Sequence, residues 1–158
     1  MKIMDFLSKK AVTADLKAKK KKEVIAELLD LLIKAGEIKP KERDLLIKTL
    51  MERESLGSTG IGQGIGIPHG KSPNVDNLVA AFGLSKEGID FESLDGEPTY
   101  IFFLLIAPED SAGPHLKALA RISRILRDKF FREMLRNAKD EKDIIRIISD
   151  EDQKKASI

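Results

Sequence analysis

The chain has 158 residues, 42% of them hydrophobic and 34% charged, and its formal net charge at pH 7 is +2. These values are typical of one soluble globular domain and give no general attraction for nucleic acids. Because cysteine is absent, disulfide bonds and thiolate zinc sites are excluded, which fits a reducing cytoplasm. The longest apolar run, residues 100–107, is far shorter than the roughly 20 residues that span a bilayer, and the first residues lack the apolar core of a signal peptide. We therefore expect a cytoplasmic protein without membrane insertion.

A run of lysines precedes the first predicted helix. Residues 17–23 have the sequence KAKKKKE, no aromatic residue lies between Phe6 and Phe82, and acidic residues follow the lysines at once. A nucleic-acid surface usually combines basic with aromatic or arginine side chains on one face. We therefore interpret the lysines as a solvated helix start and expect no nucleic-acid partner.

Two amphipathic helices are predicted in the first third of the chain. The first runs from Lys22 to Ala35, because apolar residues recur at intervals of three and four, and Gly36 ends it. The second begins at Pro40, which suits a first helical turn, and ends before Gly57. Its predicted buried face consists of Leu45, Leu46 and Leu50.

Short apolar segments in the middle of the chain predict β-strands. Residues 77–85 and 99–108 are apolar runs bounded by Gly, Pro and Asp, and the second is expected to be buried on both faces of a sheet. Between them, residues 86–88 have the chemistry of a turn, and residues 89–91 have room for a short strand.

The helical spacing returns after Pro108. Two shorter helices are predicted over residues 128–138 and 140–150, after a longer one over residues 114–128. The apolar side of the longer helix consists of Leu116, Leu119, Ile122 and Leu126. Because no repeat or linker divides the chain, we expect a single layered α/β domain over residues 1–158.

A glycine-rich segment separates the second helix from the strands. Residues 60–72 have the sequence GIGQGIGIPHGKS, in which His69 is one of only two histidines of the chain. The dinucleotide pattern G-x-G-x-x-G fails, because Ile65 or Ile67 occupies its last position. The segment ends like a Walker loop, but Ile65 replaces the first glycine and Pro68 lacks a backbone N–H. A nucleotide-binding regulatory domain that uses this loop is therefore only the alternative hypothesis.

The same residues fit a short strand better. Ile65 and Ile67 alternate with glycines, as in a strand with one apolar face, and Pro68 favours an extended backbone at Ile67. Gly70 is expected to let the chain turn sharply after His69. His69 would then lie at a strand end, where sites of α/β proteins are often found. Because a neutral imidazole is a nucleophile near pH 7, His69 is a candidate acceptor of a phosphoryl group.

Two further residues are candidates for this site. His115 follows Pro114 at the predicted start of a helix, where free N–H groups and the helix dipole favour anions. Arg53, near the end of the second predicted helix, leads into the glycine-rich segment and could reach the same pocket. Two imidazoles and one guanidinium would then surround a transferred phosphoryl group. A metal bound by the two histidines would need further acidic ligands, and those available form no metal-binding pattern: Asp76, Glu109 and Asp110. We expect no metal.

These motifs resemble a known family. LMERESLGSTGIGQGIGIPHGKSPNV (residues 50–75) and GPHLKALARIS (residues 113–123) are similar to the enzyme IIA domain of the fructose/mannitol class of the bacterial phosphotransferase system, which includes stand-alone nitrogen-regulatory members. The likeness extends over nearly the whole chain. It implies a single-domain α/β sandwich with a small mixed sheet flanked by helices.

The resemblance also implies a function. His69 would accept phosphate from phospho-HPr and pass it to an enzyme IIB, without a cofactor. His115 matches the family's second active-site histidine, and Arg53 matches its phosphate-side arginine. The carrier would serve either sugar uptake or regulation, in which its phosphorylation state controls binding to other proteins. The stand-alone length and the wording of the glycine-rich motif favour regulation slightly.

Overall fold

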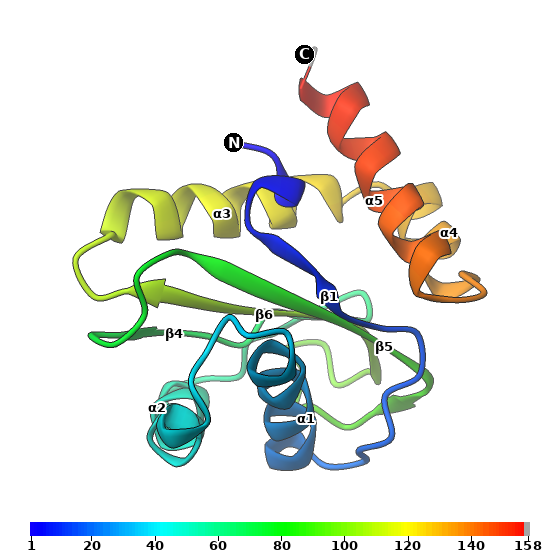
Figure 1. Cartoon of the computed structure of the whole chain (residues 1–158). Coiled ribbons are helices and arrows are strands. Elements are labelled where there is room, and N and C mark those ends of the chain that lie inside the picture. The colour runs from blue at the N-terminus through cyan, green and yellow to red at the C-terminus, as the bar shows by residue number, and fades with distance from the viewer. Residues whose placement is uncertain (157–158) are drawn as a thin grey trace.

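A mixed β-sheet lies between two layers of helices in the computed structural model, which describes residues 1–156 (Figure 1). Residues 157 and 158 of the predicted domain lie outside the described residues. The strands are β1 (Leu7–Thr13), β2 (Gly60–Gly62), β3 (Ile65–Gly66), β4 (His69–Ser72), β5 (Val79–Ile89) and β6 (Thr99–Pro108). The α-helices are α1 (Lys21–Lys34), α2 (Arg43–Ser55), α3 (Ala112–Ile125), α4 (Lys129–Arg136) and α5 (Glu141–Ala156), and short 3-10 helices cover Ile3–Asp5 and Pro40–Glu42.

The strand order is β1-β5-β6-β3-β2, and β4 pairs with β6 as well. β5 and β6 are antiparallel, whereas β1 is parallel to β5, and β3 and β4 are parallel to β6. The predicted fold class, an α/β sandwich around a small mixed sheet, is therefore confirmed.

Strand β6 forms the centre of the core. Because side chains alternate along a strand, its odd-numbered residues from 101 to 105 pack with α3, α4 and α5, and its even-numbered residues from 102 to 106 pack with α1 and α2. All six side chains are fully buried. The predicted burial of this strand on both faces is confirmed, and each of these side chains contributes about 1.5–3 kcal/mol to folding.

β3 and β4 lie in one line along β6. Ile65 pairs with Ile101 and His69 pairs with Leu105, so both strands keep the same offset to β6. The break between them falls at Pro68, which has no N–H to donate. Its carbonyl oxygen still accepts a hydrogen bond of 3.0 Å from the Leu105 N–H. The segment that carries His69 is thus an interrupted strand.

Several predicted elements differ from the observed ones. Leu45 and Leu116, expected on buried helix faces, are 54% and 64% exposed, because the buried stripes of α2 and α3 lie one residue to the side. Residues 7–13, for which no element is predicted, form β1. Residues 86–88, expected as a turn before a separate strand, belong to β5, which has a register shift between Leu84 and Ile89.

Candidate functional site

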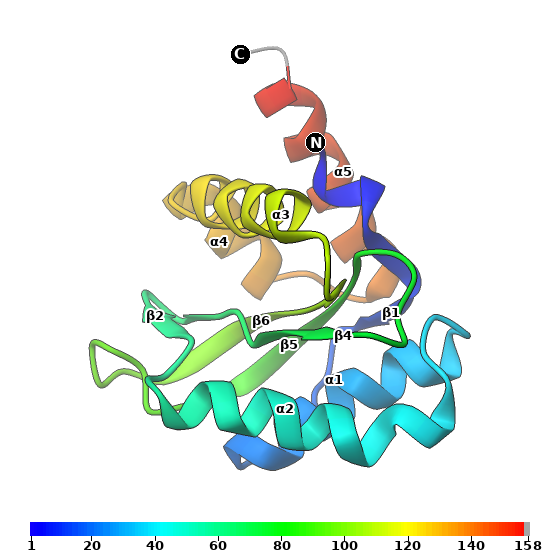
Figure 2. The same ribbon diagram turned by 90° about the vertical axis from the view of Figure 1, so that its left-hand side faces the viewer.

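His69 is the first residue of β4, directly after the break at Pro68. The expectation that His69 ends the strand of Ile65 and Ile67 is thus only partly right: His69 lies at a strand terminus, but it begins the next strand. By the alternation of side chains, His69 shares a face with Ile65 and Ile67, which belong to the core under α3, α4 and α5. In Figure 2, β4 and the beginning of α3 are turned toward the viewer. The imidazole of His69 is half-buried.

One hydrogen bond defines the state of the His69 ring. Its Nδ1 lies 2.8 Å from the carbonyl oxygen of Ile67. A carbonyl oxygen only accepts hydrogen bonds, so Nδ1 must carry the proton. In the neutral ring the lone pair is then on Nε2. The carbonyl of Ile67, two residues before the histidine, therefore determines which ring nitrogen carries the proton and leaves the lone pair on Nε2.

His115 lies in the first turn of α3 and is 6% exposed. Its ring centroid is 5.4 Å from that of His69, with the two ring planes tilted by 56°. Its Nδ1 is buried and has no hydrogen-bond partner among the described residues. The structure thus brings the rings of His69 and His115 close together, and Nδ1 of His115 makes no hydrogen bond to the described residues.

Arg53 is in the last turn of α2, where its Nη1 donates a 2.8 Å hydrogen bond to the carbonyl oxygen of Gly57. This bond holds the guanidinium at the entrance to the glycine-rich segment. Its positive charge is close enough to His69 to lower the pKa of that ring. All three predicted site residues therefore meet in one region, although they come from α2, β4 and α3.

Both imidazoles are kept neutral by their surroundings. Burial is the largest cause that lowers the pKa of His69, and Arg53 adds to it, while the hydrogen bond to Ile67 opposes it. Burial also lowers the pKa of His115, followed by the charges of His69 and Lys71. Near pH 7 both rings therefore hold lone pairs in a region that contains two permanent cations. Lys71 is a residue of this region that the sequence analysis did not select.

The glycines of residues 60–72 form a hairpin turn and part of a strand, and they do not form a phosphate-binding loop. Gly62 and Gly64 have φ angles of +97° and +78° in the tight turn of the antiparallel β2–β3 hairpin. A strand, β4, follows instead of the helix that both nucleotide-binding motifs require. The expected sharp turn at Gly70 is wrong: Gly70 is inside β4, where a Cβ atom would lie 3.4 Å from the Leu50 side chain of α2.

The candidate acidic ligands lie apart from the histidines. Together with Pro73, Val75 and Pro108, these ligands line a cavity that neither histidine lines. The ligands are Asp76, Glu109 and Asp110. Within residues 1–156, no group of three or more His, Cys, Asp or Glu side chains is placed to hold a metal ion.

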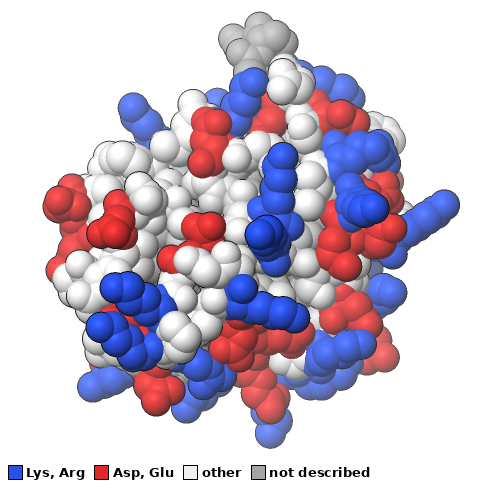
Figure 3. Space-filling view, in the orientation of Figure 1, with Lys and Arg blue, Asp and Glu red and all other residues white. Residues whose placement is uncertain are grey.

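Two features of the described residues relate to possible partners: the charges on the surface, and the length and apolar character of the helices. On the face shown in Figure 3, Lys and Arg side chains are interspersed with Asp and Glu, so this face lacks the single-signed basic surface typical of nucleic-acid binding. No helix in the described part of the chain is both long and apolar enough to cross a membrane.

The mixed sheet between two helical layers is the architecture of proteins of the enzyme IIA type. Residues 5–151 match the family model for the phosphoenolpyruvate-dependent sugar phosphotransferase system, EIIA 2, and the chain belongs to this family. The resemblance found in the sequence is thereby confirmed. The EIIA component is one of the phosphotransferase components of that system.

Two relatives with different names are similar to the chain over most of its length. The chain is 41% identical over 153 residues to the PTS system fructose-specific EIIABC component of Bacillus subtilis, covering 97% of this chain but 24% of that longer protein. It is 39% identical over 149 residues to a nitrogen regulatory protein of Bradyrhizobium diazoefficiens, covering 94% of this chain and 95% of the relative.

Solved structures show the same architecture. Nitrogen regulatory protein IIA-Ntr from Neisseria meningitidis has a TM-score of 0.83 and 30% identity, covering 92% of this chain and 98% of the other. A complex of enzyme IIAMTL with phosphorylated enzyme IIBMTL from Escherichia coli has a TM-score of 0.73 at 19% identity, covering 89% and 94%, and it shows the fold alone.

Proposed function

We propose that this protein is a phosphoryl carrier and that Nε2 of His69 accepts the phosphoryl group. The hydrogen bond from Nδ1 to the Ile67 carbonyl oxygen carries the proposal, because it leaves the lone pair on Nε2. The lowered pKa of the ring supports it, since a neutral imidazole is the nucleophilic form. Membership in the EIIA family provides the reaction class.

His115, Arg53 and Lys71 stabilise the charge of the transferred group in this proposal. Phosphoryl transfer places negative charge on three equatorial oxygens, which positioned donors and cations stabilise. The unused Nδ1 of His115, the first turn of α3 and the two permanent charges provide such groups.

The donor we propose is phospho-HPr. The lone pair of Nε2 forms the new P–N bond while the P–N bond of the donor phosphohistidine breaks, and its electron pair returns to the donor imidazole. Nδ1 of His69 keeps its proton and its bond to Ile67 throughout. Since one phosphohistidine replaces another, the exchange is nearly balanced and requires no nucleotide.

The acceptor distinguishes two versions of this function. In sugar uptake, the group would pass to an enzyme IIB. The name of the fructose-specific EIIABC relative and the complex of IIAMTL with phosphorylated IIBMTL support this version. In regulation, the phosphorylation state of His69 controls binding to another protein, which the similarity to nitrogen regulatory proteins supports.

Phosphotransfer in vitro tests the proposal. Incubation with HPr that carries a radioactive phosphoryl group should label the wild-type chain, and the label should be acid-labile and base-stable, as phosphoramidates are. His69→Ala should abolish labelling while the circular dichroism spectrum is unchanged. A label that survives in His69→Ala would refute the assignment. Addition of the organism's IIB proteins to the labelled chain then separates uptake, in which the label is lost to IIB, from regulation, in which it is retained.

A further inference from the structure

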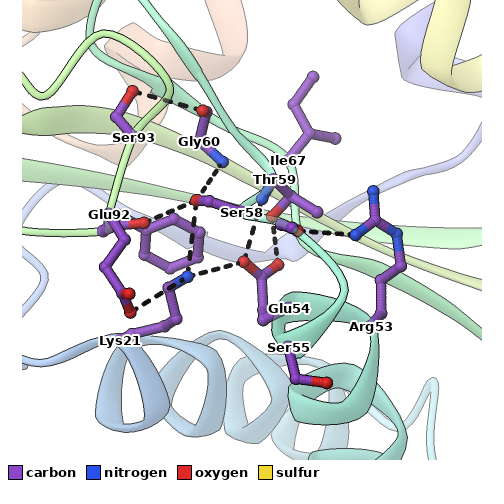
Figure 4. A network of polar contacts seen from close by, with 12 residues as sticks. Lys21, Arg53, Glu54, Ser55, Ser58, Thr59, Gly60, Ile67, Glu92 and Ser93 are labelled. Atoms are coloured by element: carbon purple, nitrogen blue, oxygen red, sulfur yellow. Dashed lines mark hydrogen bonds and ion pairs between the residues drawn. The ribbon is translucent and has the colours of Figure 1, made fainter.

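The carboxylate of Glu54 is buried directly beside the site. Glu54 follows Arg53 in the last turn of α2, and its side chain is 2% exposed. It accepts hydrogen bonds from the backbone N–H of Thr59, at 3.0 Å, and from the Thr59 hydroxyl. Figure 4 shows Glu54 turned toward Thr59 and Lys21, whereas Arg53 is turned toward the other side.

A lysine from the N-terminal cluster compensates the buried charge. Lys21 Nζ lies 3.1 Å from Glu54 and 3.6 Å from Glu92, its side chain is 11% exposed, and it lies 4.7 Å from the centroid of the Phe91 ring. The interpretation of the whole lysine run as solvated is therefore wrong for this residue. A carboxylate is buried at this depth only when it is paired, so the position is built to hold an anion.

A chain of hydrogen bonds connects this carboxylate to the nucleophile. The carbonyl oxygen of Thr59 accepts a 3.0 Å bond from the Ile67 N–H, and the carbonyl oxygen of Ile67 accepts the Nδ1–H of His69 at 2.8 Å. Pro68, next to Ile67, has no N–H that could hold the backbone here. The backbone at Ile67 is thus held by Thr59 on one side and by the bond from the Leu105 N–H to the Pro68 carbonyl oxygen on the other. Thr59 is in turn held by Glu54.

The two neighbouring side chains of α2 also act on His69 with opposite signs. The negative charge of Glu54 raises the pKa of the ring, and the positive charge of Arg53 lowers it. Loss of Glu54 would thus weaken the hydrogen bond that marks Nδ1 as the protonated nitrogen and would make the ring harder to protonate.

We infer that Glu54 is a positioning residue for His69, which acts through Thr59 and Ile67 to keep the proton on Nδ1 and the lone pair on Nε2. The effect on phosphoryl transfer rests on the proposed function, but the effect on the ring itself does not. The inference therefore has a test in the unphosphorylated protein.

Nitrogen-15 NMR of the full chain measures the tautomer and the pKa of each histidine without any donor. Wild-type His69 should be mainly protonated on Nδ1, and Glu54→Gln should increase the Nε2-protonated fraction and lower the His69 pKa. Thr59→Val, which removes the hydroxyl, should change the tautomer in the same direction, and Thr59→Ser, which keeps it, should restore the wild-type spectrum. Glu52→Gln, at an exposed position of the same helix, is the matched control.

The rate of labelling by phospho-HPr provides a second readout. We expect Glu54→Gln and Thr59→Val to be about 10- to 100-fold slower than wild type, by analogy with the loss of partners that orient metal-binding histidines. A folded Glu54→Gln chain with the wild-type tautomer and rate would overturn the inference, and Thr59→Val decides in the same way if Glu54→Gln does not fold. If the tautomer responds but wild type accepts no phosphoryl group, the proposed function fails and the positioning role stands.

Discussion

Arg121 of α3 and Asp152 of α5 form a buried ion pair in which the guanidinium Nη2 lies 3.2 Å from the carboxylate. The same carboxylate accepts the backbone N–H groups of Ile3, at 3.0 Å, and Met4, at 2.8 Å. One side chain thus connects the beginning of the chain, the last helix and the helix that carries His115 in its first turn.

Asp152→Asn should destabilise the fold by about 3 kcal/mol, because it leaves the Arg121 charge buried without its anion. Urea unfolding followed by circular dichroism measures the change. Asp150→Asn is the control, since Asp150 forms an exposed 3.6 Å pair with Arg146 and should cost roughly 0.5 kcal/mol or less. Equal effects of the two variants would contradict the prediction.

His115→Ala should slow the labelling of His69 by about 100-fold and should not abolish it. The ring is expected to stabilise charge on the transferred group without forming the P–N bond, and the loss of one such donor has this order of effect. Single-turnover transfer from phospho-HPr measures the rate. Complete loss of labelling in a folded His115→Ala chain would show that the roles of the two histidines are wrongly assigned.

Arg53→Gln should raise the pKa of His69, because the arginine charge lowers it in the wild-type chain. An NMR titration of the His69 ring measures the shift. Arg53→Lys keeps the charge but not the planar fork of donors, so it should preserve the lowered pKa and still slow phosphoryl transfer. An unchanged pKa in Arg53→Gln would place the guanidinium too far away to act on the ring.

The stability of the chain should fall as the pH decreases through about 6.5. Both histidines have a lower pKa in the folded chain than the ordinary value of 6.5, so the unfolded chain binds more protons just below that pH. Their contribution is complete above 6.5 and is lost below it. Urea unfolding at pH 7.5 and 5.5 tests this, and the double variant His69→Gln/His115→Gln should depend less on pH in this interval. The same dependence in both chains would assign the effect to other groups.

The central part of the fold could be predicted because its pattern is unambiguous. The run from Tyr100 to Ala107 is apolar without interruption, which is typical of a strand covered on both faces. β1 was not predictable in the same way: Lys9 and Lys10 are exposed within it, since an edge strand can carry charges toward solvent. The periodicity of apolar residues likewise did not determine which side chains of α3 face the core: His115 is buried and Leu116 is exposed.

The motifs could predict which residues lie near one another, but they could not predict the hydrogen bonds around these residues. His69, His115 and Arg53 were selected from their motifs, and the structure places them together. Lys71 and Glu54 were not selected, because a lysine on a strand and a glutamate in a helix have no distinctive pattern. The burial of Glu54, its bonds to Thr59 and its ion pair with Lys21 separate it from Glu52, the exposed glutamate of the same helix.

The common offset of β3 and β4 along β6 also limits how this segment can vary. Removal or insertion of one residue between Gly66 and His69 would exchange the two faces of β4, because side chains alternate. The imidazole would then be directed toward α2 and away from α3. Amino acids can be exchanged here one at a time, but the number of residues can change only in steps of two.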